Sequence, residues 1–250
     1  MAAIKLFSLV LPVYKQSNTI VKNINELESV LKTLPFKSEL IIVLDGQDLE
    51  TSRKINSLIQ KNKKGNIKFY EYELNQGKGY AVKYGVSKAK GDIIGFIDAG
   101  LDINPSEISL MINLMEWNDA DIIVGSKLHP ESKVNYPFAR KVLSWGYRTF
   151  THLLFGFTVR DTQVGLKIFK GKVARDVFPK IVVKRFAFDI EVLAVSYRLG
   201  YKKIFEAPVV LDFKNGTITS SNFWRIIFWM LWDTMAVFYR INILRYYDRK

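Results

Sequence analysis

Short apolar runs alternate with amphipathic stretches over the first half of the chain. The runs predict strands at residues 4–11, 39–44, 67–72, 92–97 and 121–125. The stretches between them predict helices at 17–34, 50–61, 79–90 and 105–117. This alternation is typical of parallel strands joined by helical crossovers, with helices on both faces of the sheet. The apolar runs IIV and IIGFI fit strands that are covered on both faces.

The pattern loosens after residue 125. It predicts helices at 137–155 and 188–199, a strand at 166–169, and a strand at 203–213 that is broken at Pro208. Residues 222–247 read as a helix rich in aromatic side chains. We therefore expect a main domain of residues 1–215, with halves 1–125 and 126–215, and a C-terminal helical segment of residues 216–250.

The N-terminal run MAAIKLFSLVLPVY has some features of a signal peptide. Lys5 interrupts the run, Pro12 ends it, and no small-residue cleavage site follows. We therefore expect a buried first strand here. No run of about 18 uncharged apolar residues occurs, so the sequence predicts no membrane-spanning helix.

Composition narrows the class of protein. Apolar residues make up 48% of the chain, which excludes a disordered protein, and the lack of cysteine excludes disulfides and thiolate metal sites. The formal charge of +13 favours an anionic partner, such as a phosphorylated metabolite or an anionic lipid surface. We expect no nucleic-acid partner, because the chain has no arginine-rich helix, stacking motif or zinc site.

Two acids stand at the end of the strand predicted at 92–97. Asp98 closes the run IIGFI, and Asp102 follows four residues later. Ligands of open parallel sheets bind beyond the carboxyl ends of the strands. We expect Asn104 to cap the next helix in a capping-box-like start, which would fix both acids over this crevice. Paired carboxylates suit Mg²⁺ or Mn²⁺ completed by substrate phosphates, although acids also occur in turns for purely structural reasons.

Two further segments converge on the same edge of the predicted sheet. Asp45 ends the strand IIVLD, and Lys78 lies in the loop NQGKG before a helix. The glycines of this loop would allow a phosphate to approach the backbone, although an ordinary helix-entry turn explains the spacing as well. Ala81, Gly85 and Ala89 recur every four residues, so one side of this helix is small and can pack closely.

Several motifs, in order, resemble those of family-2 glycosyltransferases. They are LPVYKQSNTI, IIVLDGQD, NQGKGYAVKYGVSKAKGDIIGFIDAGLD, RDTQVGLKIF and FDIEVLAVSYRLGYKKIFEAPV, and they extend from about residue 6 to residue 212. The chain is most similar to the branch of dolichyl-phosphate mannose synthases and dolichyl-phosphate glucosyltransferases. The resemblance implies an α/β, Rossmann-like fold of the GT-A type with a mostly parallel sheet. It also implies sugar transfer with inversion.

The resemblance also implies roles for particular residues. Pro12, Tyr14 and Asp45 would line the nucleotide pocket, with Lys78 beside it, and Asp98 would be the first acid of the D-x-D metal motif. Gly100 replaces the second acid, so we expect Asp102 to complete a D-x-x-x-D pair that binds Mg²⁺ or Mn²⁺ and is catalytic. The chain departs from the family again at Lys15-Gln16, where Asn-Glu is usual, and at Asp45, where paired acids are usual.

The second half should bind the acceptor. A phosphate acceptor is its own nucleophile and needs cations more than it needs a base. The candidate cations are Lys127, Arg140, Lys167 and Lys214, of which the resemblance favours the first two. Asp161, in the motif RDTQVG, would orient a cation, or act as a base if the acceptor were a hydroxyl. Asp189 and Glu191 lie two apart on a predicted helix, so at most one should face the site.

The C-terminal segment combines tryptophan and tyrosine with arginine and lysine. Such a helix favours the interface of a membrane with anionic head groups. The alternative is a helix packed on the main domain or on a second copy.

The sequence therefore leads to one hypothesis with two alternatives. The hypothesis is an inverting glycosyltransferase, peripheral at the cytoplasmic face of a membrane. Its donor would be a nucleotide-diphosphate sugar (GDP-mannose or a UDP-hexose), and its acceptor polyprenyl or dolichyl phosphate. The alternatives are transfer to a sugar hydroxyl and a non-catalytic binder of nucleotide sugars.

Overall fold

The computed structural model describes residues 4–61, 65–133, 138–185, 187–211 and 223–248, without the side chains of 138–144 and 223–226. The strands are β1 (Leu6–Val13), β2 (Lys37–Asp45), β3 (Ile67–Tyr72), β4 (Ile93–Ile97), β5 (Ile122–Ser126), β6 (Leu166–Lys170) and β7 (Ile204–Pro208). The helices are α1 (Ile20–Thr33), α2 (Leu49–Lys61), α3 (Lys78–Lys88), α4 (Glu107–Trp117), α5 (Phe138–Phe155), α6 (Gly171–Val177), α7 (Phe188–Arg198) and α8 (Phe223–Asn242). Two 3₁₀ turns are formed by Phe178–Lys180 and Tyr246–Asp248.

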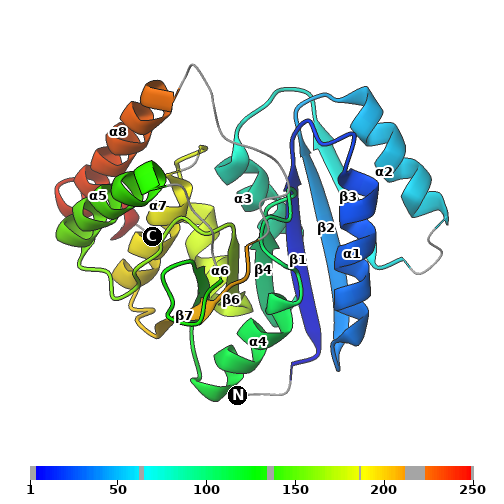
Figure 1. The fold of residues 1–250 in the computed structure, drawn as a ribbon, viewed down its shortest axis with the longest axis horizontal. Helices are drawn as coiled ribbons and strands as arrows, with labels where there is room; N and C mark the ends of the chain where they lie inside the picture. The colour runs from blue at the N-terminus through cyan, green and yellow to red at the C-terminus, as the bar shows by residue number, and fades with distance from the viewer. Residues whose placement is uncertain (1–3, 62–64, 134–137, 186, 212–222, 249–250) are drawn as a thin grey trace.

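The seven strands form one sheet in the order β3-β2-β1-β4-β6-β5-β7 (Figure 1). All neighbouring pairs are parallel except those that β6 makes with β4 and β5. This confirms the expected α/β fold with a mostly parallel sheet. The strand order reverses direction at β1 and β4, and in such sheets this switch point opens a crevice at the carboxyl ends of the strands.

Helices cover both faces of the sheet, as the continuous apolar runs predict. Along β1, Leu9 and Leu11 belong to the core formed with α1, α2 and α4. Val10, which points to the other face, belongs to the core formed with α3, α6 and α7. Both cores are built from fully buried aliphatic and aromatic side chains, which explains why the strands lack the polar alternation of a half-exposed sheet.

Most predicted elements are present with ends shifted by a few residues, and some details are wrong. Helix α4 begins at Glu107, two residues later than predicted, after a tight turn in which the N–H groups of Glu107 and Ile108 donate to the carbonyls of Asn104 and Pro105. Asn104 Oδ1 accepts hydrogen bonds from the backbone N and Oγ of Ser106 at 3.0 and 2.9 Å, which is the contact expected of a capping residue. The capping box is absent, since the N–H of Asn104 donates to the carbonyl of Val210.

Strand β7 ends at Pro208, where the predicted strand is broken, and Val210 and Leu211 beyond it form isolated bridges; residues 212 and 213 lie outside the described residues. The short helix α6 was not predicted.

The C-terminal helix α8 has two different sides. Thr234, Val237 and Ile241 are buried, and α8 contacts α5 and α7, beside which it lies at the end of the molecule away from α2 (Figure 1). The other side exposes apolar side chains at helical spacing: Phe228, Leu231, Trp232, Met235 and Tyr239. Of the helices that the structure describes, none is both long enough and apolar enough to cross a membrane.

A buried carboxylate fastens the end of the chain to the main domain. Glu191 of α7 is fully buried and accepts hydrogen bonds from the hydroxyl of Tyr247 and from Arg240 Nη1. It also accepts the backbone N–H groups of Val182 and Val183, at 3.0 and 2.7 Å. Burial raises the pKa of Glu191 even though these donors oppose the shift. One side chain thus joins α7, α8 and the segment before α7.

The close packing of α3 on the sheet confirms the role predicted for Ala81 and Gly85, whereas Ala89 follows the last residue of the helix. Ala81 is fully buried, and a Cβ on Gly85 would overlap Val10 Cγ1 and lie 3.1 Å from Val43 Cγ2. Gly85 therefore lets α3 approach β1 and β2, which matters because α3 carries Lys78 at its first position.

We expect Gly85→Ala to lower the free energy of unfolding by about 1–3 kcal/mol, because the added methyl group overpacks this contact. Gly146→Ala is the matched control. Gly146 is an exposed position in α5 with no atom within 4 Å of an added Cβ, so alanine should stabilise the protein by about 0.5–1 kcal/mol. Urea denaturation measures both, and equal stabilities would contradict the packing argument.

Candidate active site

The site lies at the carboxyl edge of the parallel strands. In the register of β1 and β2, Pro12 is opposite Val43 and Val13 is opposite Leu44. The ends of β1, β2 and β4 therefore lie at one edge, as predicted. Pro12 is buried within β1, and Tyr14, which follows β1, is 49% exposed. Tyr14 is accessible to a ligand, whereas Pro12 is covered, and a contact of either residue with a nucleotide stays a prediction.

Asp45, at the end of β2, organises the loop before α3. Its buried carboxylate accepts hydrogen bonds from Tyr72 Oη (2.8 Å), Asn75 Nδ2 (3.0 Å) and the backbone N–H groups of Gln76 (2.7 Å) and Gly77 (2.9 Å). Burial, together with this carboxylate, raises the pKa of Tyr72. These donors belong to the chain itself, so Asp45 acts in the structure by shaping the loop. A direct contact with a nucleotide stays a prediction.

The glycines around Lys78 are required by close contacts with the segment before α7. Gly77 has a φ of 97°, and a Cβ there would lie 2.5 Å from the carbonyl oxygen of Lys184. A Cβ on Gly79 would lie 2.6 Å from Phe188 Cβ, and the Gly79 N–H donates to the Lys184 carbonyl at 2.8 Å. The two glycines therefore allow the loop to pack against the segment before α7 and the start of α7, and this packing directs Lys78 toward the site.

Four side chains of alternating charge lead from the core to the site. Lys167 of β6 is fully buried; its ammonium donates to Asp189 Oδ1 and, at 2.7 Å, to the carbonyl of Val164. Asp189 Oδ2 lies 3.9 Å from Lys78 Nζ, which forms an ion pair of 2.6 Å with Asp98 Oδ1. We refer to Lys167, Asp189, Lys78 and Asp98 as the charge row.

In the charge row, burial lowers the pKa of each lysine and the neighbouring carboxylates raise it. Burial works to lower the pKa of Lys78, but the carboxylates of Asp98 and Asp189 outweigh it, so the pKa lies above its ordinary value. For Lys167, burial lowers the pKa and Asp189 only partly offsets the shift. Lys78 is therefore a firmly charged cation beside the site.

A strained turn presents Asp98 and Asp102. The N–H of Leu101 donates to the Asp98 carbonyl at 3.0 Å, and Leu101 has a left-handed φ of 48° while its side chain is buried. Asn23 of α1 fixes the turn by donating to the Ala99 carbonyl at 2.7 Å. Asp102 Oδ1 lies 3.9 Å from the place that a Cβ on Gly100 would occupy. Its carboxylate thus reaches the neighbourhood of the missing second acid.

Gly165, in the loop before β6, packs against Asp98. Its carbonyl accepts the Asp98 N–H at 3.0 Å, and a Cβ on Gly165 would overlap the Asp98 carboxylate. Only glycine leaves room for this carboxylate, whose side chain is 46% exposed.

Asp98 and Asp102 fit a divalent cation that is completed by substrate oxygens. Both are hard oxygen donors on one short turn, one partly exposed and one exposed. Within the described ranges no group of three or more His, Cys or acidic side chains could hold a metal ion. Mg²⁺ and Mn²⁺ accept such an incomplete set when phosphates of a substrate supply the remaining ligands.

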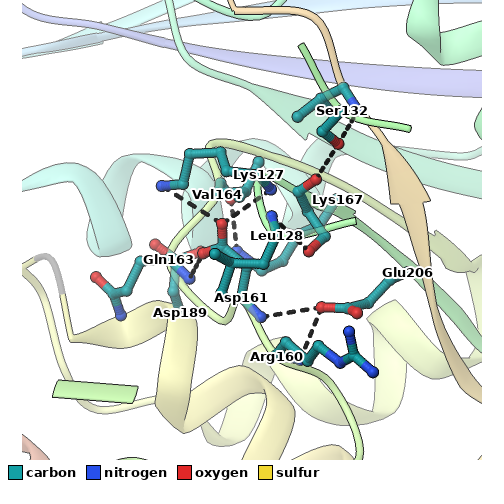
Figure 2. Close-up of polar contacts among 12 residues, drawn as sticks. Lys127, Leu128, Ser132, Arg160, Asp161, Gln163, Val164, Lys167, Asp189 and Glu206 are labelled. Carbon is teal, nitrogen blue, oxygen red and sulfur yellow. Dashed lines mark hydrogen bonds and ion pairs between the residues drawn. The ribbon is translucent and has the colours of Figure 1, made fainter. Parts of the chain in front are cut away.

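In the second half of the chain, where we expect the acceptor to bind, Asp161 contacts Lys127, the residue that follows β5 (Figure 2). Asp161 Oδ2 accepts the backbone N–H of Lys127 at 3.0 Å and lies 3.6 Å from its ammonium, while Oδ1 accepts the N–H of Gln163 at 3.3 Å. Glu206 of β7 fixes this loop by accepting the N–H groups of Arg160 and Asp161, at 2.7 and 2.9 Å. Asp161 therefore orients a cation.

The remaining candidates are placed as follows. Lys167 is buried in the charge row and faces no open surface. Arg140 lies in α5 with a side chain outside the described part, and Lys214 lies outside the described residues. Asp189 faces the site and Glu191 faces α8, so the expectation that at most one of them faces the site is confirmed.

The sequence did not point to three residues that hold the loops of the site in place: Asn23, Gly165 and Glu206. Asn23 and Glu206 act across long sequence separations, and nothing in their local pattern marks them. Gly165 does stand within the quoted motif RDTQVG, so its role could have been sought there.

Comparison with known proteins identifies relatives over about three quarters of the chain. A Dictyostelium discoideum protein named dolichyl-phosphate beta-glucosyltransferase is 30% identical over 206 residues, 77% of this chain and 62% of that protein. The human protein of the same name is 30% identical over 205 residues, 77% of this chain and 63% of that protein. The matched region thus spans about three fifths of the length of these relatives.

Solved structures share the fold at low sequence identity. Mycobacterium tuberculosis glucosyl-3-phosphoglycerate synthase in complex with Mn²⁺, UDP and phosphoglyceric acid has a TM-score of 0.67 at 16% identity, covering 94% of this chain and 78% of that one. Its complex with Mn²⁺, UDP-glucose and phosphoglyceric acid gives 0.66 at 15% identity, covering 94% and 79%. These likenesses confirm the GT-A-type fold. The family model of glycosyl transferase family 2 matches residues 8–178, more than half of the sequence, and the chain therefore belongs to that family.

Proposed function

We propose that the protein transfers a hexose, specifically glucose from UDP-glucose, to dolichyl or another polyprenyl phosphate, with inversion at the sugar carbon. The acceptor and the sugar are supported by the relatives named dolichyl-phosphate beta-glucosyltransferase, and the donor by the solved neighbours that bind UDP-glucose. The observation that carries the proposal is the grouping of Lys78, Asp98 and Asp102 at the carboxyl edge of a family-2 fold.

On the donor side, Tyr14 and the loop held by Asp45 would bind the nucleotide, and Asp98 and Asp102 would hold Mg²⁺ or Mn²⁺. When bound, the ion would neutralise charge on the departing diphosphate. Lys78 adds a second positive charge beside the ion, and Asp189 keeps its ammonium near this place. An acceptor phosphate oxygen forms its bond to the sugar carbon while the bond to the diphosphate breaks, and the electron pair leaves with the diphosphate.

The protein's acidic side chains favour a phosphate acceptor over a sugar hydroxyl. A hydroxyl needs a base, and the two candidate carboxylates are Asp161 and Asp189. Asp161 accepts two backbone N–H groups and pairs with Lys127, while Asp189 lies between Lys167 and Lys78. Both are engaged with the chain's own donors, which argues against either as a base and supports a phosphate acceptor, which needs none; Lys127, oriented by Asp161, would be a cation near that phosphate.

The exposed apolar side of α8 supports a further part of the proposal, a position in the interface of a membrane. Arg185 places its guanidinium 5.6 Å from the ring centre of Trp229, and Arg245, just after α8, is exposed. Aromatic rings beside arginines fit a lipid surface with anionic head groups. A lipid acceptor would reach the site from that surface. The cytoplasmic side of the membrane stays a prediction.

A screen of UDP-glucose and GDP-mannose against a short prenyl phosphate tests the reaction directly. With Mn²⁺ and radiolabelled UDP-glucose, we expect label in the organic phase, and little with GDP-mannose or after chelation of the metal. Label only in an aqueous sugar product would favour a hydroxyl acceptor. Donor binding without any turnover would favour a non-catalytic binder.

Asp98→Ala should abolish transfer while the circular dichroism spectrum stays unchanged. Gly165→Ala should lower kcat/KM by about a hundredfold, because the added methyl group displaces the Asp98 carboxylate. Gly100→Ala is the matched control: its Cβ would meet only Asp102 Oδ1, at 3.9 Å, and should change kcat/KM by less than about threefold. Full activity of Gly165→Ala would refute the placement of Asp98.

The double variant Phe228→Ser/Trp232→Ser tests the lipid surface of α8. We expect the wild type to sediment with vesicles that contain anionic lipid, and the double variant to bind them at least about tenfold more weakly, since two exposed rings are lost. Trp117→Ser removes a tryptophan that is 87% exposed at the end of α4, and it should leave vesicle binding unchanged. Equal binding by all three proteins would exclude α8 as the contact.

A further inference from the structure

We propose that Lys78 acts as a built-in competitor of the metal ion. In the free protein its ammonium occupies Asp98, and it leaves this carboxylate for the diphosphate when metal and nucleotide bind together. The inference rests on the donor side of the proposed function and adds to it a rule of binding: the metal alone is disfavoured, and metal and nucleotide diphosphate recruit each other.

The competition follows from which atoms are paired. Lys78 Nζ lies 2.6 Å from Asp98 Oδ1, so the ammonium already occupies the partly exposed carboxylate that a metal would need. A divalent ion at Asp98 would stand within a few ångströms of this ammonium. At about 4 Å the repulsion of even two unit charges is about 1 kcal/mol in water and more near a protein surface. A metal ion that binds Asp98 Oδ1 must therefore displace Lys78, and one that binds the other oxygen is repelled by it.

Lys78 cannot simply withdraw into solvent. It is the first residue of α3, where the bond from the Gly79 N–H to the Lys184 carbonyl fixes the backbone. The ammonium lies 5.9 and 5.6 Å from the ring centres of Phe96 and Phe188, and only 18% of its side chain is exposed. A displaced ammonium thus remains close to the metal and needs a new anionic partner.

Asp189 gives Lys78 a second anchor. Asp189 Oδ2 is 3.9 Å from Lys78 Nζ, while Oδ1 is held by the buried ammonium of Lys167. Lys78 can move off Asp98 and stay between Asp189 and an arriving diphosphate. A diphosphate neutralises the metal ion and the Lys78 ammonium at once, whereas without it the two cations repel each other. This is a positive coupling between two ligands, and such coupling is reciprocal.

Titration of the whole protein with Mn²⁺, alone and with saturating UDP, measures the coupling without any turnover. Electron paramagnetic resonance of free Mn²⁺ reports the bound fraction. In the wild type, UDP should raise the affinity for Mn²⁺ at least about tenfold. In Lys78→Met, the affinity for Mn²⁺ alone should rise about tenfold, because one competing charge is gone, while the affinity for UDP in the presence of Mn²⁺ should fall.

Lys88→Met is the matched control, since it removes one lysine from the other end of α3, where the ammonium lies over the rings of Tyr70 and Tyr84. Its affinity for Mn²⁺ alone should equal that of the wild type. Lys78→Gln provides a second variant without the charge, and circular dichroism checks that each variant is folded.

Two results would overturn the inference. One is a folded Lys78 variant that binds Mn²⁺ alone no more tightly than the wild type. The other is a wild type that binds Mn²⁺ equally well with and without UDP while it does bind UDP. Failure to bind UDP at all would instead count against the proposed donor, and the comparison of Mn²⁺ alone among the variants would still decide the competition.

Discussion

The charge row is the constraint on which the site depends. A lysine as deeply buried as Lys167 needs a carboxylate partner, and Asp189 is that partner. Lys167 holds one oxygen of Asp189, so the second oxygen points toward Lys78. Lys78 in turn pairs with Asp98. The position of Lys78 is thus tied to an ion pair in the interior, while the turn held by Asn23 and Gly165 places Asp98 beside it.

Much of the fold follows from local patterns. The apolar runs located the strands, and the rule that ligands bind at the carboxyl ends of parallel strands was enough to place Asp45 and Asp98 at one edge. The role of Asp45 was beyond this reasoning, because its four donors come from β3 and from the loop before α3. The burial of Lys167 could not be predicted either. Its partner Asp189 lies in α7, 22 residues later in the sequence, and the segment LKIFK alone is typical of a strand with exposed lysines.

The reversed strand β6 explains how the two halves of the chain share one site. Strands parallel to β1 present their ends at the carboxyl edge, whereas an antiparallel strand presents its beginning there. The loop that precedes β6 therefore arrives beside the end of β4, which is why Gly165 contacts Asp98 and why Asp161 reaches Lys127 after β5. A fully parallel order would have carried this loop to the opposite edge.

The buried carboxylate of Glu191 has a consequence for how the C-terminal segment can be handled. It holds Tyr247 on one side and the backbone of Val182 and Val183 on the other, and the neighbouring Lys184 carbonyl supports the glycines around Lys78. The turn that carries Tyr247 is thus connected through Glu191 and residues 182–184 to the loop before α3. Truncating the chain before Tyr247, for example to remove the exposed apolar side of α8 and obtain a more soluble fragment, would therefore also remove a support of the loop that carries Lys78.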